Sequence, residues 1–447
     1  ISPPVAKALF HRQPAVRLLA AGIVPALGDQ AVFLVPELVD ALCDKESEVR
    51  AAVASALMAL GRDAASAVTA LADALLDPTA GVRLTAAQAL GALGPVAVPV
   101  VGALIAAMGD EQAGVRRAAA GAVGSLGQIA AGEVVPQVID ALRTGNSEAR
   151  LLCTGVLKTI GRDAAAAVPV LITTLRDPQA DVRRAASGTL GALALDAPDA
   201  TLPALRAELA DPAAATHHVL VVAALRAAGK HAAPAVPQLV ELLGSADVDL
   251  RTAGAEALKA VGQQAPADAV PALIEALGDT AQAHVRVLAA GVLEAIGPGA
   301  AAAVAALTKG VGDPTPAVRR AAATALGAMG QAAVSATPAL TKAVEDLDPT
   351  VRRAAAESLG SIGPAASSSL KALIDAQGDA NPALRSAAAG AVQAIAAGAP
   401  QEAVPLLAAA LTHENVEVRY LSAGALQAVG KAAAPAVGEL TAALGDA

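Results

Sequence analysis

The stretch from Asp313 to Gly330, DPTPAVRRAAATALGAMG, returns with few changes as DPTVRRAAAESLGSIG from Asp348 to Gly363. Both copies contain a Val-Arg pair, with Leu seven residues after the Arg and Gly eleven residues after it. The same pattern recurs along the whole chain at intervals of 33 to 35 residues. A fixed period of this length predicts a stack of repeated units rather than a closed globular domain.

The basic residue of the pattern occurs once in each repeat. Position seven after it is Leu or Val in all thirteen repeats, and position eleven is Gly in eleven of them, with Ala194 and Ala396 as the exceptions. His218 replaces the Arg in one repeat. The other basic residues are Arg17, Arg50, Arg83, Arg116, Arg150, Arg183, Arg251, Arg286, Arg319, Arg352, Arg385 and Arg419.

The Val-Arg segment has the spacing of an amphipathic helix. Apolar residues at Val318, Ala322, Leu326 and Met329 lie on one face of an α-helix. Gly330 follows, and glycine favours the positive φ at which many helices end. Each repeat therefore predicts a helix that its glycine caps.

A further apolar segment follows each glycine after a short Ala-rich loop. Examples are VPELVDAL from Val35, VPVLITTL from Val168, VPQLVELL from Val236 and VPALIEAL from Val270. Proline fits the first turn of a helix, where its missing N–H has no intrahelical acceptor. Each repeat is thus expected to hold a proline-started first helix and an antiparallel, Arg-bearing second helix. The predicted fold is an all-α, right-handed α-α superhelix of about 13 two-helix repeats.

An acidic turn joins the two helices of a repeat. An Asp lies six residues before the Arg in seven repeats, and Asp211 and Asp279 lie one residue further out. We expect each Arg to bind this carboxylate in its own turn and the free carbonyls of the preceding helix end. The alternative is a row of anion-binding arginines, but the built-in acidic partners favour a structural ladder. The seven turn residues are Asp44, Asp77, Asp110, Asp177, Asp313, Asp346 and Asp379.

The repeats predict one domain over residues 1–447, with an irregular junction near residues 194–218. This junction loses the capping glycine, gains residues and loses the Arg. Because a regular stack changes curvature where its spacing changes, we expect a bend or flexible joint there.

Composition argues against nucleic-acid binding. A formal charge of -9 and only three aromatic residues argue against nucleic-acid binding, which depends on clustered cations and stacking platforms. Four repeats carry a second arginine that the turn does not use, and these are candidates to face a protein partner: Arg117, Arg184, Arg320 and Arg353.

Glycine also fills the fifth position after the Arg in seven repeats. These residues are Gly22, Gly121, Gly155, Gly188, Gly291, Gly390 and Gly424. Close packing of a neighbouring helix is the favoured explanation, since glycine otherwise weakens a helix. The alternative is a smooth groove for a partner helix or strand, with Gly121 and Gly155 as partner-facing candidates.

No motif for catalysis, metal binding or a cofactor is visible. Among the six histidines only His217, His218 and His231 cluster in sequence, and adjacent residues on a helix point about 100° apart, which disfavours a shared metal ion. His218 is expected to take the place of the Arg and bond Asp211. Cys43 and Cys153 are expected to be buried thiols without a disulfide.

One uncharged stretch, Leu84 to Gly109, has the length of a membrane span. Gly91, Gly94 and Pro95 interrupt it where helix ends are due, so we expect helix, loop and helix and no membrane span. We expect a soluble protein, cytoplasmic or exported after N-terminal processing. The chain starts at Ile1 and stops after a first helix that has no second helix, which favours a processed product or a part of something longer.

With these positions in place, the sequence resembles the HEAT repeats over essentially its whole length, and specifically the short HEAT-like type named after phycobilisome lyases. The resemblance implies an Asp-Arg ladder along the stack, here Asp313 with Arg319 and Asp346 with Arg352. One ladder partner is missing at His11, Thr144, His218, Ser245 and His413. Ankyrin and tetratricopeptide repeats fit less well because their marker residues are absent.

The resemblance also implies a function: a non-catalytic scaffold that binds protein partners through second helices lining a concave surface, or a structural subunit of a larger assembly. Some relatives are enzymes. Hydroxylases of this type bind iron through several His-Glu pairs, whereas this chain has only His413-Glu414. A bilin-lyase-like or other accessory enzyme is the alternative, although no short motif supports it.

Overall fold

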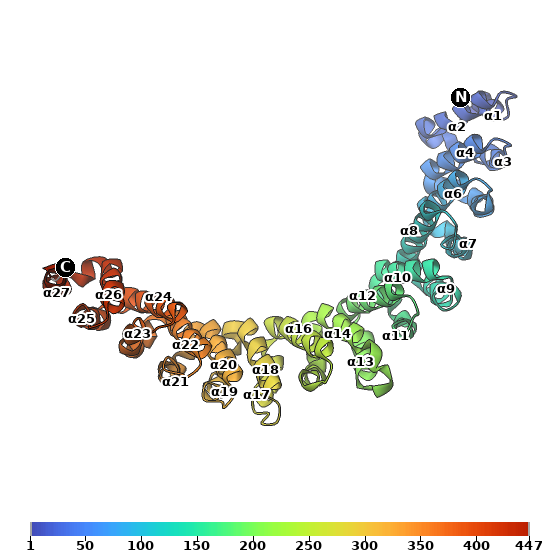
Figure 1. Cartoon of the computed structure of the whole chain (residues 1–447). Coiled ribbons are helices and arrows are strands. Elements are labelled where there is room, and N and C mark those ends of the chain that lie inside the picture. Colours follow the sequence, from blue (N-terminus) through green and yellow to red (C-terminus); the bar gives the residue numbers. More distant parts are fainter. Residues whose placement is uncertain (1, 446–447) are drawn as a thin grey trace. The chain divides into compact units, whose positions relative to one another are not determined.

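A computed structural model describes residues 2–445, and all secondary structure in this range is helical. The chain divides into two compact units, Ile1–Ala228 and Gly229–Ala447. Within each unit, pairs of helices follow one another in chain order (Figure 1). Thirteen Arg-bearing or His218-bearing second helices are present, which confirms the predicted all-α fold and the number of repeats.

The first unit contains seven repeats. Its first helices are α1 (Ser2–Leu9), α3 (Val35–Ala41), α5 (Val68–Asp73), α7 (Val101–Ala107), α9 (Ala131–Thr144), α11 (Val168–Thr174) and α13 (Pro198–Ala210). Its second helices are α2 (Pro14–Ile23), α4 (Ser47–Leu60), α6 (Ala80–Leu93), α8 (Ala113–Ile129), α10 (Ser147–Ile160), α12 (Ala180–Asp196) and α14 (His218–Ala227).

The second unit contains six repeats and one further first helix. Its first helices are α15 (Val236–Glu241), α17 (Pro266–Leu277), α19 (Val304–Gly310), α21 (Thr337–Ala343), α23 (Leu370–Ala376), α25 (Pro400–Ala410) and α27 (Val437–Gly445). Its second helices are α16 (Val248–Gln264), α18 (Ala283–Ile296), α20 (Pro316–Met329), α22 (Pro349–Ile362), α24 (Pro382–Gly398) and α26 (Val416–Val429).

Short 3₁₀ helices join many of these elements. They are η1 (Val24–Leu34), η2 (Gly61–Ala67), η3 (Ala74–Leu76), η4 (Gly94–Val100), η5 (Gly161–Ala167), η6 (Pro212–His217), η7 (Gly229–Ala235), η8 (Leu242–Gly244), η9 (Gly297–Ala303), η10 (Gly330–Ala336), η11 (Gly363–Ser369) and η12 (Gly430–Ala436).

The regular repeat follows the sequence pattern closely. Helix α20 has proline in its first turn and ends at Gly330, whose φ of 57° is the positive value that a residue with a Cβ avoids. The Ala-rich segment that follows is the 3₁₀ helix η10 rather than a loop, and it leads directly into α21. Ala322 and Leu326 of α20 are fully buried, as the apolar spacing predicts.

Four repeats depart from this plan. Gly127 and Gly262 do not cap helices: they lie inside α8 and α16, so the predicted caps are wrong at these two positions. Helices α12 and α24 likewise run past Ala194 and Ala396. In each case one alanine with non-helical backbone angles separates the two helices. These residues are Ala130, Ala197, Ala265 and Ala399.

One or two inserted residues explain the departure. The four repeats are those with an Arg-to-Arg step of 34 or 35, as in 150 − 116 = 34 and 286 − 251 = 35. The second helix takes up added residues and the first helix begins before its proline, so Pro271 lies inside α17 rather than at its start. A Cβ at Gly127 would lie 2.3 Å from Cδ1 of Ile160. Packing against the next repeat therefore explains this glycine.

Second helices of adjoining repeats pack closely on one another. The Ser358 hydroxyl donates to the Ala323 carbonyl of the preceding repeat at 2.7 Å, and Thr189 donates to Thr154 at 2.9 Å. A Cβ at Gly360 would lie only 2.9 Å from Cα of Ala391. The core thus depends on small residues that let the helices approach.

The arginine ladder connects adjoining repeats rather than the two ends of one turn. Nη1 of Arg50 donates to the carbonyls of Asp44 at 2.7 Å and Lys45 at 3.2 Å, as predicted. Its Nε and Nη2 donate to the carboxylate of Asp77, in the next repeat, at 2.6 and 2.9 Å. The predicted pairing of each Arg with the carboxylate of its own turn, such as Arg319 with Asp313, is therefore wrong.

The turn itself explains this shift. Oδ1 of Asp77 accepts a hydrogen bond from the Thr79 backbone at 2.8 Å, which holds its carboxylate over its own turn and toward the preceding repeat. Arg50 of that repeat completes the site. The described residues contain six pairs with both bonds: Arg17–Asp44, Arg50–Asp77, Arg83–Asp110, Arg150–Asp177, Arg286–Asp313 and Arg319–Asp346. A seventh pair, Arg352–Asp379, has a single longer bond from Nη2 at 3.4 Å.

The ladder stops at the four longer repeats. Arg116, Arg183, Arg251 and Arg385 lie on the lengthened helices α8, α12, α16 and α24 and bind turn carbonyls, but among the described residues none binds the carboxylate of a turn Asp in the following repeat. Thr144 and His413 occupy two of the Asp positions, while Asp211 and Asp279 are displaced by one residue in the other two.

Other polar contacts occur at these positions. The side-chain amide of Asn415 donates to the Gly378 carbonyl of the preceding repeat at 3.3 Å. His218 does occupy the position of an Arg, but Nε2 lies 3.1 Å from the backbone carbonyl oxygen of Asp211 rather than near its carboxylate. The boundary between the two units, after Ala228, falls in the part of the chain where regular ladder pairs are missing.

The ladder carboxylates are held in the ionised form. Burial of Asp77 opposes ionisation, but hydrogen bonds from Arg50 and the Thr79 backbone outweigh this effect and lower its pKa. The pKa is lowered in the same direction at Asp44, Asp110, Asp177, Asp313 and Asp346.

We predict that Asp77→Asn lowers the free energy of unfolding by about 1–3 kcal/mol near neutral pH, because Arg50 loses its charged acceptor. A carboxylate with a lowered folded pKa stabilises above its unfolded value, and this contribution disappears as pH falls below about 4. The difference between wild type and variant should therefore shrink in acid. Urea unfolding at several pH values measures it.

Asp279→Asn is the matched control, because within the described residues the Asp279 carboxylate accepts hydrogen bonds from the Ala281 and Gln282 backbone and not from an Arg, and asparagine can keep those bonds. Equal losses in the two variants would contradict a stabilising ladder.

We further propose that residues 194–218 form a flexible joint, since they lack both a glycine cap and a ladder pair. Backbone amides there should exchange with deuterium about tenfold faster than those of residues 313–330. Hydrogen exchange followed by mass spectrometry measures this, and equal protection of the two segments would contradict the joint.

Candidate protein-interaction surfaces

The seven glycines at the fifth position after the Arg line an open face of the second helices. A Cβ built at Gly22, Gly121, Gly155, Gly188, Gly291, Gly390 or Gly424 meets no atom within 4 Å. The favoured explanation, that they let a neighbouring helix approach, is therefore wrong. Packing instead explains other glycines such as Gly91, where a Cβ would lie 3.1 Å from Cβ of Ala122.

A second small residue lies one turn further along the same face. The ninth position after the Arg is Ala, Ser or Thr in all thirteen repeats, for example Ser125, Ala328 and Ser361. Residues four apart are neighbours on a helix surface. This pattern of small residues is visible in the sequence itself. Together the two positions make the face shallow in the seven repeats that have the glycine, whereas Gln88, Glu256 and Glu357 occupy the fifth position in three other repeats.

The four additional arginines lie on this face, four residues before the glycine position. Arg184 pairs with Asp181 of its own helix, and Nε of Arg353 lies 3.7 Å from Glu357. Arg117 and Arg320 are exposed and form no ion pair within residues 2–445. On α8 the face thus presents an unpaired cation, Arg117, one turn from Gly121.

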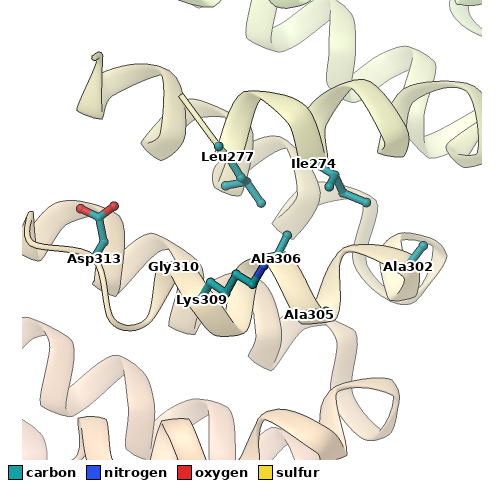
Figure 2. Close-up of a pocket in the computed structure, with 9 residues that line it drawn as sticks. Ile274, Leu277, Ala302, Ala305, Ala306, Lys309, Gly310 and Asp313 are labelled. Atoms are coloured by element: carbon teal, nitrogen blue, oxygen red, sulfur yellow. The ribbon is translucent and has the colours of Figure 1, made fainter. Parts of the chain in front are cut away.

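Grooves between successive first helices form a different kind of surface in the second unit. Ile274 and Leu277 of α17 face Ala306 and Lys309 of α19 across a groove of about 410 Å³ (Figure 2). Asp313 lies at one end. Similar grooves of about 500 and 530 Å³ lie between α19 and α21 and between α21 and α23. These grooves form between repeats, so the pattern within one repeat does not predict them.

The titratable residues elsewhere offer no assembled site. His217 Nδ1 lies 3.0 Å from the Thr216 hydroxyl, and burial together with the nearby charge of Arg176 lowers the His217 pKa. In the described part of the chain, no three His, Cys, Asp or Glu side chains gather closely enough to hold a metal ion.

The cysteines differ from each other. Cys153 is buried as predicted, and burial raises the pKa of its thiol to about 12, which keeps it protonated. Cys43 is exposed, contrary to prediction. Helix α3 ends at Ala41, so Cys43 lies in the turn beyond the apolar stripe. Both cysteines are free.

Three stretches are long and apolar enough to cross a membrane by length and composition alone: Ser47–Leu76, Ala80–Ala107 and Ala283–Gly310. The second contains most of the uncharged stretch singled out above. It consists of α6, η4 and α7, with Gly94 at a φ of 69° where the interruption was predicted. The absence of a membrane span stays a prediction.

Comparisons with known proteins agree with the fold. The sequence matches the family described as HEAT repeats over residues 2–91, 68–150, 236–315, 270–344 and 304–392, and a single HEAT repeat over residues 167–197. No curated protein sequence matches this chain significantly. The short phycobilisome-lyase subtype stays a prediction.

Solved karyopherin structures share the fold at low sequence identity. The crystal structure of Kap121p has a TM-score of 0.52 at 13% identity and covers 95% of this chain and 53% of its own. Kap121p bound to the extreme C-terminus of the protein phosphatase Cdc14p has a TM-score of 0.53 at 14% identity, and the match covers 95% of this chain and 53% of that one. Kap121p bound to RanGTP has a TM-score of 0.51 at 14% identity, and the match covers 95% of this chain and 52% of that one. This chain spans about half the length of these structures.

We predict that Gly121→Ala leaves the protein as stable as wild type or raises its free energy of unfolding by up to about 1 kcal/mol, because alanine is the better helix former and its Cβ meets no atom. Gly330→Ala is the contrasting variant and should lower stability by about 1–2 kcal/mol, because Gly330 has a positive φ. Urea unfolding compares them, and a large loss in Gly121→Ala would restore the packing explanation.

Proposed function

The chain belongs to the HEAT-repeat family, and from this premise we propose that it is a non-catalytic scaffold that binds protein partners, or a structural subunit of a larger assembly. Its binding surface is the open face of the second helices. The open space over the seven glycines carries this proposal.

Glycine weakens a helix by about 1 kcal/mol relative to alanine, so seven glycines in one exposed register need a reason other than stability. A partner that approaches the helix backbone supplies one. The ninth-position Ala, Ser and Thr residues keep the same face low. Unpaired Arg117 and Arg320 add cations that suit carboxylates on a partner.

The structural neighbours support the proposal that the partner of this chain is a protein. In two of these structures Kap121p is bound to the extreme C-terminus of Cdc14p and to RanGTP. A HEAT-repeat stack can thus bind both a chain terminus and a folded protein. No specific contact in the structure favours the bilin-lyase-like alternative.

The test is partner capture with surface variants. The double variant Gly121→Gln and Gly155→Gln adds side chains to the open face in adjoining repeats and should fold normally, because neither Cβ meets an atom within 4 Å. Thr69→Gln is the matched control, on the exposed side of α5 in the same unit. We predict that wild type and Thr69→Gln recover the same protein from the native source, and that the double variant recovers about tenfold less.

Quantitative mass spectrometry of the captured proteins measures this recovery, and circular dichroism checks folding. Equal recovery by all three proteins would contradict the proposed surface, and recovery of no specific protein by wild type would contradict the scaffold itself.

A further inference from the structure

Two neighbouring repeats carry a lysine at a first-helix position that is acidic in six other repeats. The residue ten positions before the Arg or His of each repeat is Asp or Glu in six repeats: Asp40, Asp73, Asp140, Glu208, Glu241 and Asp375. It is lysine in the repeats of Arg17, Arg319 and Arg352, where it is Lys7, Lys309 and Lys342. Lys309 and Lys342 therefore reverse the charge of this row in two successive repeats of a chain whose net charge is -9.

Each of these two lysines lines a groove between first helices. Lys309 lies on α19 across from Ile274 and Leu277 of α17 (Figure 2). Lys342 lies on α21 and lines the neighbouring groove toward α19. Both lysines are exposed and form no ion pair within the described residues. Each groove thus combines an apolar wall with a lysine that forms no ion pair within the described residues.

The carboxylates in these grooves are mostly neutralised. Asp313 is bound by Arg286 at 2.8 and 3.0 Å, and Asp346 by Arg319 at 2.7 and 2.8 Å. The groove between α17 and α19 therefore has Lys309 as its one uncompensated charge among the lining residues. In the groove between α19 and α21, Glu345 also lines the surface. The first groove is accordingly the stronger site for an anion.

The apolar part of the surface is open. Ala302, Ala305 and Ala306 leave room opposite Ile274 and Leu277. Leu347 lines the next groove and is 97% exposed, the highest value for a large apolar residue in the described part of the chain. An exposed leucine beside a groove is a contact for an apolar side chain of a partner.

The spacing of the grooves selects a conformation for the ligand. Second helices of adjoining repeats pack on one another at about 8–10 Å, and this repeat distance sets the approximate spacing of the grooves between successive first helices. A polyproline II segment has three residues per turn and rises about 3.1 Å per residue, so every third side chain points the same way at intervals of about 9 Å. A β-strand fits less well, because residues three apart point to opposite faces.

We propose that the two grooves formed by α17, α19 and α21 bind a polyproline II segment of a partner protein, with an apolar residue at every third position and an acidic residue next to it. The apolar side chains enter the grooves, and the carboxylates bind Lys309 and Lys342. This inference rests on the proposed scaffold function, but it concerns the first helices rather than the second.

The test uses synthetic fluorescent peptides and the full chain. The probe is four repeats of Leu-Asp-Pro, with four repeats of Leu-Lys-Pro as the charge control and three repeats of Leu-Asp-Pro-Ser as the spacing control. Fluorescence anisotropy should show the probe binding about tenfold more tightly than either control. Equal affinity of the three peptides, or no binding of the probe at about 1 mM, would overturn the proposal.

Charge variants test which groove residues contribute to binding of the probe. Lys309→Glu should weaken binding of the probe about tenfold, and Lys342→Glu should weaken it less, because Glu345 already offsets Lys342. Glu345→Gln should strengthen it about twofold. Lys158→Glu, on the exposed side of α10 in the first unit, is the control and should change nothing. Unchanged binding in Lys309→Glu, with folding confirmed by circular dichroism, would also overturn the proposal.

These results are separable from the test of the scaffold function. If the probe fails while partner capture still depends on Gly121 and Gly155, only the first-helix grooves are excluded. If the probe binds while capture is unaffected by Gly121 and Gly155, the second-helix face is excluded and the grooves stand as the binding surface.

Discussion

One guanidinium group joins each pair of regular repeats. Through Nη1 it binds the carbonyls of its own turn, and through Nε and Nη2 it binds the carboxylate of the next turn, as Arg50 does with Asp44, Lys45 and Asp77. The same carboxylate also accepts a backbone N–H of its own turn. Each bridge therefore fixes two turns and the distance between them, which keeps second helices close enough for a core made largely of alanine.

The bridge depends on an uninterrupted register. Where one or two residues are added, the second helix lengthens, the capping glycine disappears or becomes a packing residue, and the Asp is replaced or displaced. Gly127 shows this change most clearly, because it keeps the glycine of the pattern but lies inside α8 and packs against Ile160. The longer repeats thus keep the helix pair and lose the bridge.

The period and its helical spacing were sufficient to predict the all-α fold, the thirteen repeats and the cap at Gly330, because these depend on local backbone preference and on which face is apolar. The acceptor of each Arg was not predictable in the same way, since Asp44 and Asp77 are equally consistent with the spacing around Arg50 until the packing between repeats is known. The open face over Gly121 was misjudged for the same reason. The grooves beside Lys309 and Lys342 lie between repeats, so the sequence of a single repeat does not predict them.

The uneven spacing of the bridges also says how such a chain can be rebuilt. From Arg286 to Asp379 the pairs follow one another without a gap, and the same is true from Arg17 to Asp110. Each of these runs is a cassette whose internal joints are all of one type, bounded by joints of another type. Insertion, deletion or exchange of whole thirty-three-residue modules should be tolerated best inside a cassette, where the severed joint can be remade with an identical one.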